Sequence, residues 1–188
     1  MAKVRKARRA LMRSTVVGPV VLALFLVLFV GSAPASPDHI WIVSTTADPG
    51  PAGCVPSPGG CSLRGAINAA NAAGGTNAID FTMFGASGVQ TITLSSALPP
   101  IAVQTTIDGT TEPNHGSSPF GIAIDGGAVT DEVHNQITGG VQGMVLAPGS
   151  GGSTIRGLAF GNFNISQQAD PALEIDSDGN TIAGDTFG

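Results

Sequence analysis

Two aspartates in the same short sequence could carry out acid–base chemistry. Asp108 lies in the Ile-Asp-Gly of residues 107–109, and Asp125 lies in the Ile-Asp-Gly of residues 124–126. Two carboxyl groups on neighbouring strands can have different pKa values and divide the acid and base roles of a glycoside hydrolase. Aspartate before glycine is also an ordinary turn pair. Asp108 and Asp125 are therefore catalytic candidates, and a structural role is the favoured interpretation of both.

A second acidic set has a spacing that could suit a cation. Glu174, Asp176 and Asp178 alternate, so a strand would place all three on one face. Carboxylate oxygens are the ligands that Ca²⁺ prefers, although the sequence here lacks the spacing of an EF-hand. These residues are candidates for a Ca²⁺ site, with a solvated acidic edge as the simpler alternative. No other cofactor is expected.

The basic residues restrict the chemistry further. Residues 36–188 contain two arginines, Arg64 and Arg156, and no lysine, against 13 acidic residues, so their formal charge is 2 − 13 = −11. Such a surface repels nucleic acid and anionic polysaccharide, and nucleic acid is excluded as a partner. A polysaccharide lyase of the parallel β-helix type typically uses Arg or Lys as its base. Arg64 is interpreted as structural, and a catalytic role for Arg156 is the lesser alternative.

Residues 1–35 have the organisation of a signal peptide. Basic residues precede an apolar run of 15 residues from Val16 to Val30, and Ala33-Pro-Ala35 supplies a cleavage site. The run is shorter than the roughly 20 apolar residues of a membrane span. We expect export and a secreted or cell-surface location. An uncleaved segment, which would be the only membrane contact, remains the alternative, and twin-arginine export through Arg8-Arg9 is left open.

The two cysteines are expected to form a disulfide. Cys54 and Cys61 are separated by six residues, four of which are Pro or Gly. After export they meet an oxidising environment, and no other Cys or His is near in sequence to complete a metal site.

A helix is predicted directly after the second cysteine. Ser62 is a suitable N-cap, Leu63, Ile67 and Ala70 fall on one face, and Gly74-Gly75 ends the periodic run. The stretch from Cys61 to Asn71 resembles the CSLREA motif of secreted bacterial proteins that have right-handed parallel β-helix domains. Gly65 stands where the motif has Glu, which breaks the capping box.

One short β-rich segment precedes the predicted helix, and several follow it. Ser153–Gly161 and Asn180–Gly188 match at five of nine positions, at an offset of 27 residues. Apolar residues alternate within several segments, which indicates strands with one buried face. The strands are expected at 40–43, 77–81, 90–94, 103–107, 121–124, 143–147, 153–156 and 172–175.

The 27-residue repeat and the resemblance to the CSLREA motif together predict an all-β fold. Residues 75–188 are expected to form the coils of a right-handed parallel β-helix, a solenoid. Residues 36–74 are expected to add an N-terminal strand, the disulfide loop and a capping helix. Because Gly188 closes a repeat unit with no cap beyond it, the solenoid is expected to be truncated at the C-terminus.

The expected function is a non-catalytic secreted or cell-surface scaffold, adhesin-like or matrix-associated. Enzymatic activity is uncertain, with absence favoured. The alternative is a carbohydrate-active enzyme, a polysaccharide lyase or glycoside hydrolase of the pectate-lyase-like fold. An extracellular glycan or another β-helix segment is the kind of partner that these interpretations imply.

Overall fold

The computed structural model describes residues 36–48, 54, 61–83, 87–127, 143–163 and 171–188. Residues 37–188 form one compact unit. The predicted signal peptide at 1–35 lies outside the described residues. No helix among the described residues is long and apolar enough to cross a membrane.

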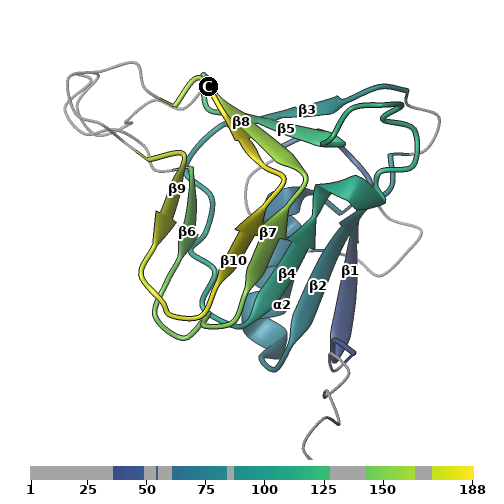
Figure 1. The fold of residues 1–188 in the computed structure, drawn as a ribbon. Helices are drawn as coiled ribbons and strands as arrows, with labels where there is room; N and C mark the ends of the chain where they lie inside the picture. The colour runs from purple at the N-terminus through teal and green to yellow at the C-terminus, as the bar shows by residue number, and fades with distance from the viewer. Residues whose placement is uncertain (1–35, 49–53, 55–60, 84–86, 128–142, 164–170) are drawn as a thin grey trace, which may run out of the picture. The chain divides into compact units, whose positions relative to one another are not determined.

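The largest sheet has five parallel strands, in the order β1-β2-β4-β7-β10 (Figure 1). They are β1 (His39–Val43), β2 (Asn77–Phe81), β4 (Thr105–Asp108), β7 (Thr154–Arg156) and β10 (Thr181–Ala183). Side chains alternate between the two faces of a strand. The inward row runs in register across the sheet as Trp41, Ile79, Ile107, Ile155 and Ile182. The alternating apolar pattern thus builds an isoleucine ladder that faces the core.

Two smaller parallel sheets complete the strands. The order of the first is β11-β8-β5-β3, with β3 (Gln90–Thr93), β5 (Ile122–Asp125), β8 (Leu158–Gly161) and β11 (Thr186–Phe187). Its inward row is Ile92, Ile124, Phe160 and Phe187. The second pairs β6 (Met144–Leu146) with β9 (Leu173–Ile175). A short 3-10 helix, η2 (Gly109–Thr111), follows β4.

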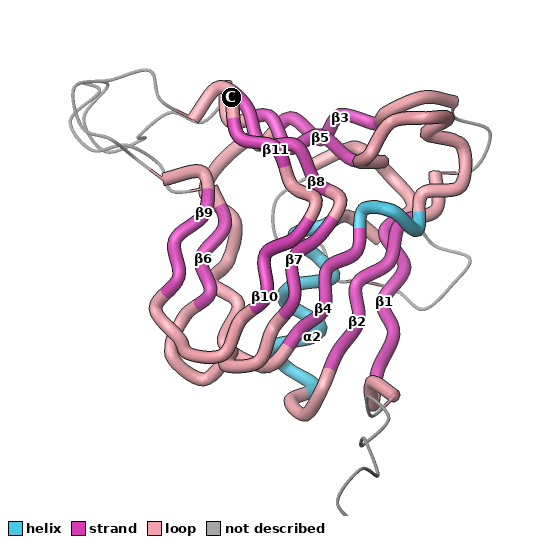
Figure 2. The backbone as a smooth tube through the Cα atoms, in the orientation of Figure 1, coloured by secondary structure: helices cyan, strands magenta, loops and turns pink. Residues whose placement is uncertain are grey.

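Helix α2 (Leu63–Ala73) lies against β1 and β2 (Figure 2). The Ser62 hydroxyl accepts a hydrogen bond from the Gly65 N–H at 3.1 Å, and Gly74 ends the helix with a φ of 69°. Glycine adopts this left-handed conformation without the steric cost that a Cβ would impose. Leu63 and Ile67 are buried in the same core as the strands. The predicted helix and its N-cap are confirmed.

The predicted all-β fold, a right-handed parallel β-helix, is wrong. The described residues form a mixed α/β fold with three separate parallel sheets and a helix that shares their core. Partners in the largest sheet are 38, 28, 48 and 27 residues apart (77 − 39, 105 − 77, 154 − 106, 181 − 154), so the connections are uneven. Alternation within a strand indicates a buried face, but it does not determine how strands far apart in sequence are grouped into sheets. The 27-residue repeat does pair with itself in parallel, as β7 with β10 and β8 with β11.

Candidate functional site

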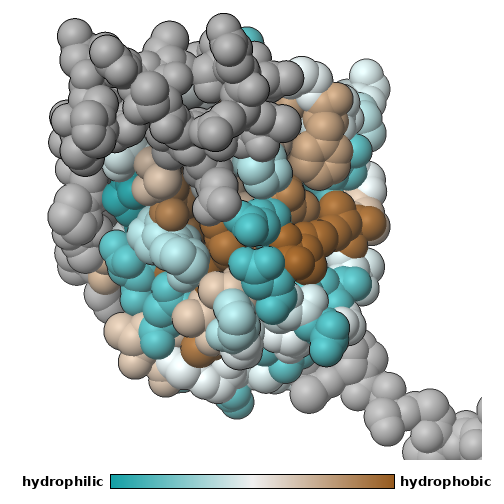
Figure 3. Space-filling view, turned by 90° about the vertical axis from the view of Figure 1, so that its left-hand side faces the viewer, coloured by the Kyte–Doolittle hydropathy of each residue, from teal (hydrophilic) through white to brown (hydrophobic). Residues whose placement is uncertain are grey.

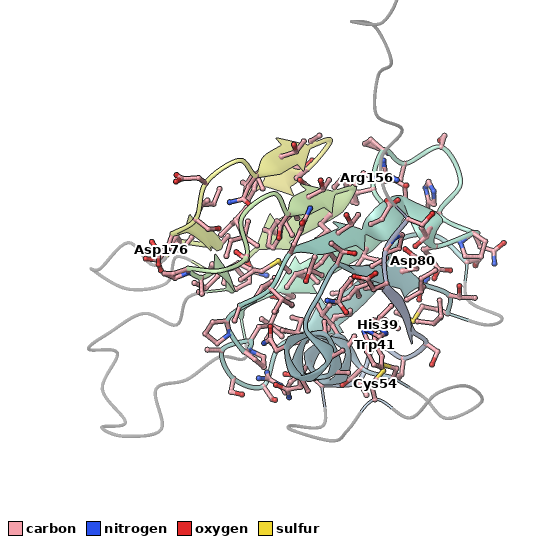
Figure 4. The ribbon with its side chains drawn as sticks, turned by 90° about the horizontal axis from the view of Figure 1, so that it is seen from below. His39, Trp41, Cys54, Asp80, Arg156 and Asp176 are labelled. Carbon is pink, nitrogen blue, oxygen red and sulfur yellow. A yellow bond between two sulfur atoms is a disulfide. The ribbon has the colours of Figure 1, made fainter. Side chains whose placement is uncertain are left out.

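Three charged residues form a row across the largest sheet, on the face opposite the isoleucine ladder. Asp80 of β2 is in register with Asp108 of β4, and Asp108 is in register with Arg156 of β7. Neighbouring strands in a sheet lie about 4.8 Å apart, so side chains in one register row are close neighbours. Figure 4 labels Asp80 and Arg156 at the two ends of this row. We call Asp80, Asp108 and Arg156 the charged row.

Asp108 is the central and best-bonded member of the charged row. It is 4% exposed, and its carboxylate accepts a hydrogen bond from Nη2 of Arg156. Its Oδ1 also accepts from the Thr110 N–H at 3.0 Å and the Thr110 hydroxyl at 2.6 Å, which caps η2. Burial alone would raise the pKa of Asp108, but the hydrogen bonds from Arg156 and Thr110 hold it below its usual value. Asp108 is therefore held as a carboxylate.

Asp80 has the opposite electrostatic surroundings. No hydrogen bond to its carboxylate is found among the described residues. Burial and the neighbouring charge of Asp108 raise the pKa of Asp80, and Arg156 offsets only part of this. Two adjacent carboxyl groups thus have pKa values displaced in opposite directions. A difference of this kind between two carboxyl groups is the feature from which acid and base roles are divided in catalysis.

Asp80 is not among the site residues expected from the sequence. It lies in Ala-Ile-Asp-Phe at 78–81, within a predicted strand. One signal could have found it. The Ile-Asp at 79–80 precedes the Ile-Asp at 107–108 by 28 residues, close to the 27-residue repeat.

The structure does not bring Asp125 to Asp108. Asp125 lies on β5, in the four-stranded sheet, whereas Asp108 lies in the five-stranded one. Its Oδ1 accepts hydrogen bonds from the Asn162 side-chain amide and the Gly127 N–H, each at 2.9 Å. These bonds, that from Asn162 foremost, lower the pKa of Asp125. Asp125 is therefore ionised and hydrogen-bonded to nearby groups, and it lies away from the charged row.

The proposed calcium ligands do not share one strand face. Strand β9 contains Glu174 but ends at Ile175, so Asp176 and Asp178 lie in the turn that follows. Asp176 is well separated from Asp80 and Arg156 (Figure 4). Within the described ranges, no group of three His, Cys, Asp or Glu side chains is placed to hold a metal ion.

Arg64 has a structural environment. Its Nε and Nη2 donate to the two carboxylate oxygens of Asp48, both at 2.7 Å, and its guanidinium also donates to the carbonyls of Ser96 and Ala97. The side chains of Arg64 and Asp48 are only 6% and 3% exposed. Burial would raise the pKa of Asp48, but hydrogen bonds from Arg64 and Ser95 hold it below its usual value. These buried hydrogen bonds of the Arg64 guanidinium link helix α2 to two surrounding loops.

Two further features of the motif are structural. The disulfide between Cys54 and Cys61 is present, with the Cα atoms 4.7 Å apart, which confirms the predicted pairing. The Asn71 side chain donates to the carbonyl of Pro100 at 2.8 Å and accepts from the Ala102 N–H at 2.9 Å. Each of these side chains fastens the helix region to the rest of the core.

Comparison with protein-family models, with curated proteins and with solved structures finds no match to this chain.

Proposed function

We propose that this protein is a non-catalytic scaffold, secreted or held at the cell surface, of the kind that the CSLREA-like motif suggests. The main support for this proposal is that its charged side chains are already paired within the fold. Both arginines in residues 36–188 are held in ion pairs, and Asp108 and Asp125 accept several local hydrogen bonds each. Groups bonded in this way support the fold and are poorly placed to turn over a substrate.

The state of the arginines argues against a lyase in particular. A lyase base must accept a proton from its substrate. Arg64 is buried and donates to Asp48 and two backbone carbonyls. The hydrogen bond to Asp108 raises the pKa of Arg156 further above its already high value. Arg64 is therefore occupied by its partners, and Arg156 is poorly suited to release and regain a proton near neutral pH.

The location is tested by fractionating cells that produce the full chain and measuring the intact mass of the product. We expect a product in the medium or on the cell surface that begins at Ser36 and retains the Cys54–Cys61 disulfide. A product that keeps residues 1–35 and stays inside the cell would contradict the proposal.

A carbohydrate-active enzyme is the second candidate, and one observation favours it. Asp80 and Asp108 are adjacent carboxyl groups with pKa values displaced in opposite directions. In a glycoside hydrolase, a protonated Asp80 would donate to the leaving oxygen while the Asp108 carboxylate acts as base or nucleophile. Neutral glycans are the substrate class that the net negative charge permits.

Activity assays separate the two candidates. Purified protein is incubated with pectin, alginate and neutral glycans, and reducing ends and unsaturated products are measured. The scaffold proposal expects no turnover. Turnover that falls about 100-fold or more in Asp80→Asn, but not in the surface control Asp38→Asn, would replace the scaffold with an enzyme. Turnover that is unchanged in Asp80→Asn would exclude the charged row as its source.

A further inference from the structure

The face of the five-stranded sheet opposite the isoleucine ladder, which we call the outward face, carries a second row of polar side chains beside the charged row. Thr106 of β4, Thr154 of β7 and Thr181 of β10 are in register, and we call them the threonine row. Figure 1 shows these three strands side by side. Neighbouring strands lie about 4.8 Å apart, and residues two apart along a strand lie about 6.6 Å apart. The two rows therefore form a regular polar grid.

The hydroxyls of the threonine row are not used within the described part of the chain. Elsewhere in the fold, the hydroxyls of Thr105, Thr110 and Thr111 each donate to an oxygen of the protein. Those of the threonine row make no such hydrogen bond among the described residues. Thr181 is exposed, and the other two members are half-buried. Because a hydroxyl can both donate and accept, the row presents unused hydrogen-bonding groups at the spacing of the strands.

The charged row adds both an acceptor and donors. The carboxylate of Asp80 is influenced by burial and by neighbouring charges, and accepts no hydrogen bond from the described residues. Arg156 is 52% exposed, and its one hydrogen bond among these residues runs from Nη2 to Asp108. A guanidinium has five N–H donors, so most of those of Arg156 are unused. Asp80 and Arg156 thus offer hydrogen bonds on either side of Asp108.

These groups fit a ligand that carries many hydroxyls and no net charge. Sugar hydroxyls both donate and accept, which matches a surface that offers both kinds of partner. The two aspartates and one arginine of the charged row sum to −1, and residues 36–188 carry −11, so an anionic polymer is repelled. Neither row contains the aromatic side chains that are typical of protein interfaces. Apolar side chains gather instead on the side of the molecule on which β9 lies (Figure 3).

We infer that the outward face binds a neutral polysaccharide that runs across the strands. The inference rests on the scaffold proposal for its setting outside the cell, and it names the partner that the scaffold holds. A chain of sugar units that crosses the sheet meets β2, β4, β7 and β10 in turn, so its repeated hydroxyls meet side chains repeated at strand spacing. Ile40 and Ile42 of β1 are exposed and in line with the two rows, and they offer apolar surface to the C–H face of a sugar ring.

The test measures binding to three insoluble neutral polysaccharides: cellulose, chitin and starch. Immobilised alginate and pectin serve as anionic comparisons. The protein is produced from the full chain and purified in the processed form that the cells yield. Bound protein is determined from its depletion from solution over a concentration series. We expect saturable binding to at least one of the neutral polysaccharides and none to the anionic ones.

Substitutions locate the binding site. Thr106→Val combined with Thr154→Val removes two hydroxyls and keeps the β-branched shape, so the fold should survive, which circular dichroism checks. This double variant and, separately, Arg156→Ala should each weaken binding about tenfold, because hydrogen bonds to the ligand are lost. The matched control is Thr91→Val combined with Thr186→Val. It removes two exposed hydroxyls from the four-stranded sheet and should leave binding unchanged.

Two kinds of result would overturn the inference. The first is failure to bind all three neutral polysaccharides, or binding that the double variant and Arg156→Ala leave unchanged. The second is binding confined to the anionic polymers or to an oligolysine peptide titrated in the same buffer, because recognition would then depend on charge alone. An exported protein that fails these assays leaves the scaffold proposal standing. A protein retained inside the cell contradicts the scaffold proposal, whereas the binding measured on purified protein still decides the inference.

Discussion

The region around helix α2 and the last three strands, β9, β10 and β11, cover their side chains to different degrees. Around the helix, both partners of the Arg64–Asp48 pair are buried, at 6% and 3% exposed, and a disulfide closes the adjacent loop. On β7, which pairs with β10, Arg156 is 52% exposed although its partner Asp108 is buried, and Phe187 of β11 lies half in water. A charge pair buried at both partners must be complete, whereas a pair with one partner half in water is partly screened and contributes less.

The apolar residues at the two edges of the largest sheet also differ. Ile40 and Ile42 of β1 are exposed and project on the face opposite Trp41, away from the core, so their exposure does not interrupt the packing. Ile182 of β10 is in register with the buried Ile155 and packs against the core while partly buried. Ile182 therefore takes part in the core, whereas Ile40 and Ile42 do not.

The largest effect that this comparison predicts is at Arg64. Arg64→Ala leaves Asp48 buried without its guanidinium and removes two bonds to backbone carbonyls. We expect a loss of about 3–5 kcal/mol in the free energy of unfolding, measured by urea titration. The control Arg64→Lys keeps the positive charge but cannot make the paired guanidinium hydrogen bonds. It should therefore recover only part of the lost free energy of unfolding. A loss below that of Arg156→Ala would invalidate the contrast between the regions.

The Arg64–Asp48 ion pair should also make the stability of the protein depend on pH. The pKa of Asp48 in the folded protein lies below its usual value of 3.8. Its contribution to stability is therefore present above about pH 3.8 and is lost as the pH falls through the lowered folded value. Urea titrations at several acidic pH values should show Arg64→Ala and the unchanged protein converging as the pH falls.

The disulfide should have the next largest effect. Replacing both Cys54 and Cys61 by Ser opens a short loop that the bond closes in the folded protein. We expect a loss of about 2–3 kcal/mol, because the unfolded chain gains conformational freedom. Thermal unfolding of the double variant, beside the unchanged protein with and without reductant, measures it. Reductant should affect only the unchanged protein. Equal melting temperatures throughout would show that the loop is held by other contacts.

Arg156 should matter much less than Arg64. It lies half in water, so the loss of its pair with Asp108 in Arg156→Ala should cost about 1 kcal/mol or less in urea titration. Asp108 keeps its hydrogen bonds from Thr110. The cost should shrink at high salt, which screens exposed pairs, whereas that of Arg64→Ala should change little. If salt changed the stability loss of the two variants equally, the two ion pairs would not differ in their exposure to solvent as proposed.

The smallest expected effect is a gain, at Asp80. Its pKa in the folded protein is raised by burial and by Asp108, so its ionised form opposes folding at neutral pH. Stability linked to a raised carboxyl pKa is fully present below about pH 3.8 and is lost as the pH rises through the folded value. Asp80→Asn should therefore stabilise the protein at neutral pH, by up to about 1 kcal/mol, and not at low pH. The control Asp38→Asn should not stabilise it, because hydrogen bonds from Thr76 lower the pKa of Asp38. A gain that persists at low pH would have another cause.

Local elements could be predicted from the sequence because short-range interactions determine them. Ser62 as N-cap and Gly74 as terminator define helix α2, and the six-residue spacing of the cysteines is compatible with their disulfide. The β-rich segments, several with alternating apolar residues, located most of the strands, among them β2 and β5, but did not include β8, β10 and β11. The function classes inferred from composition and the motif stay predictions.

Long-range pairing was decided only by the tertiary structure. Alternation within Asn77–Phe81 shows that Ile79 and Asp80 face opposite sides, but not that Asp108 and then Arg156 stand beside Asp80. Offsets of 28 and 48 residues separate these strands, so a single repeat length could not supply the register. The sequence alone therefore determined the helix, the disulfide and the strand faces, each through neighbouring residues. The division into three sheets and the charged row depend on contacts between distant segments, whose register is set by packing of the shared core.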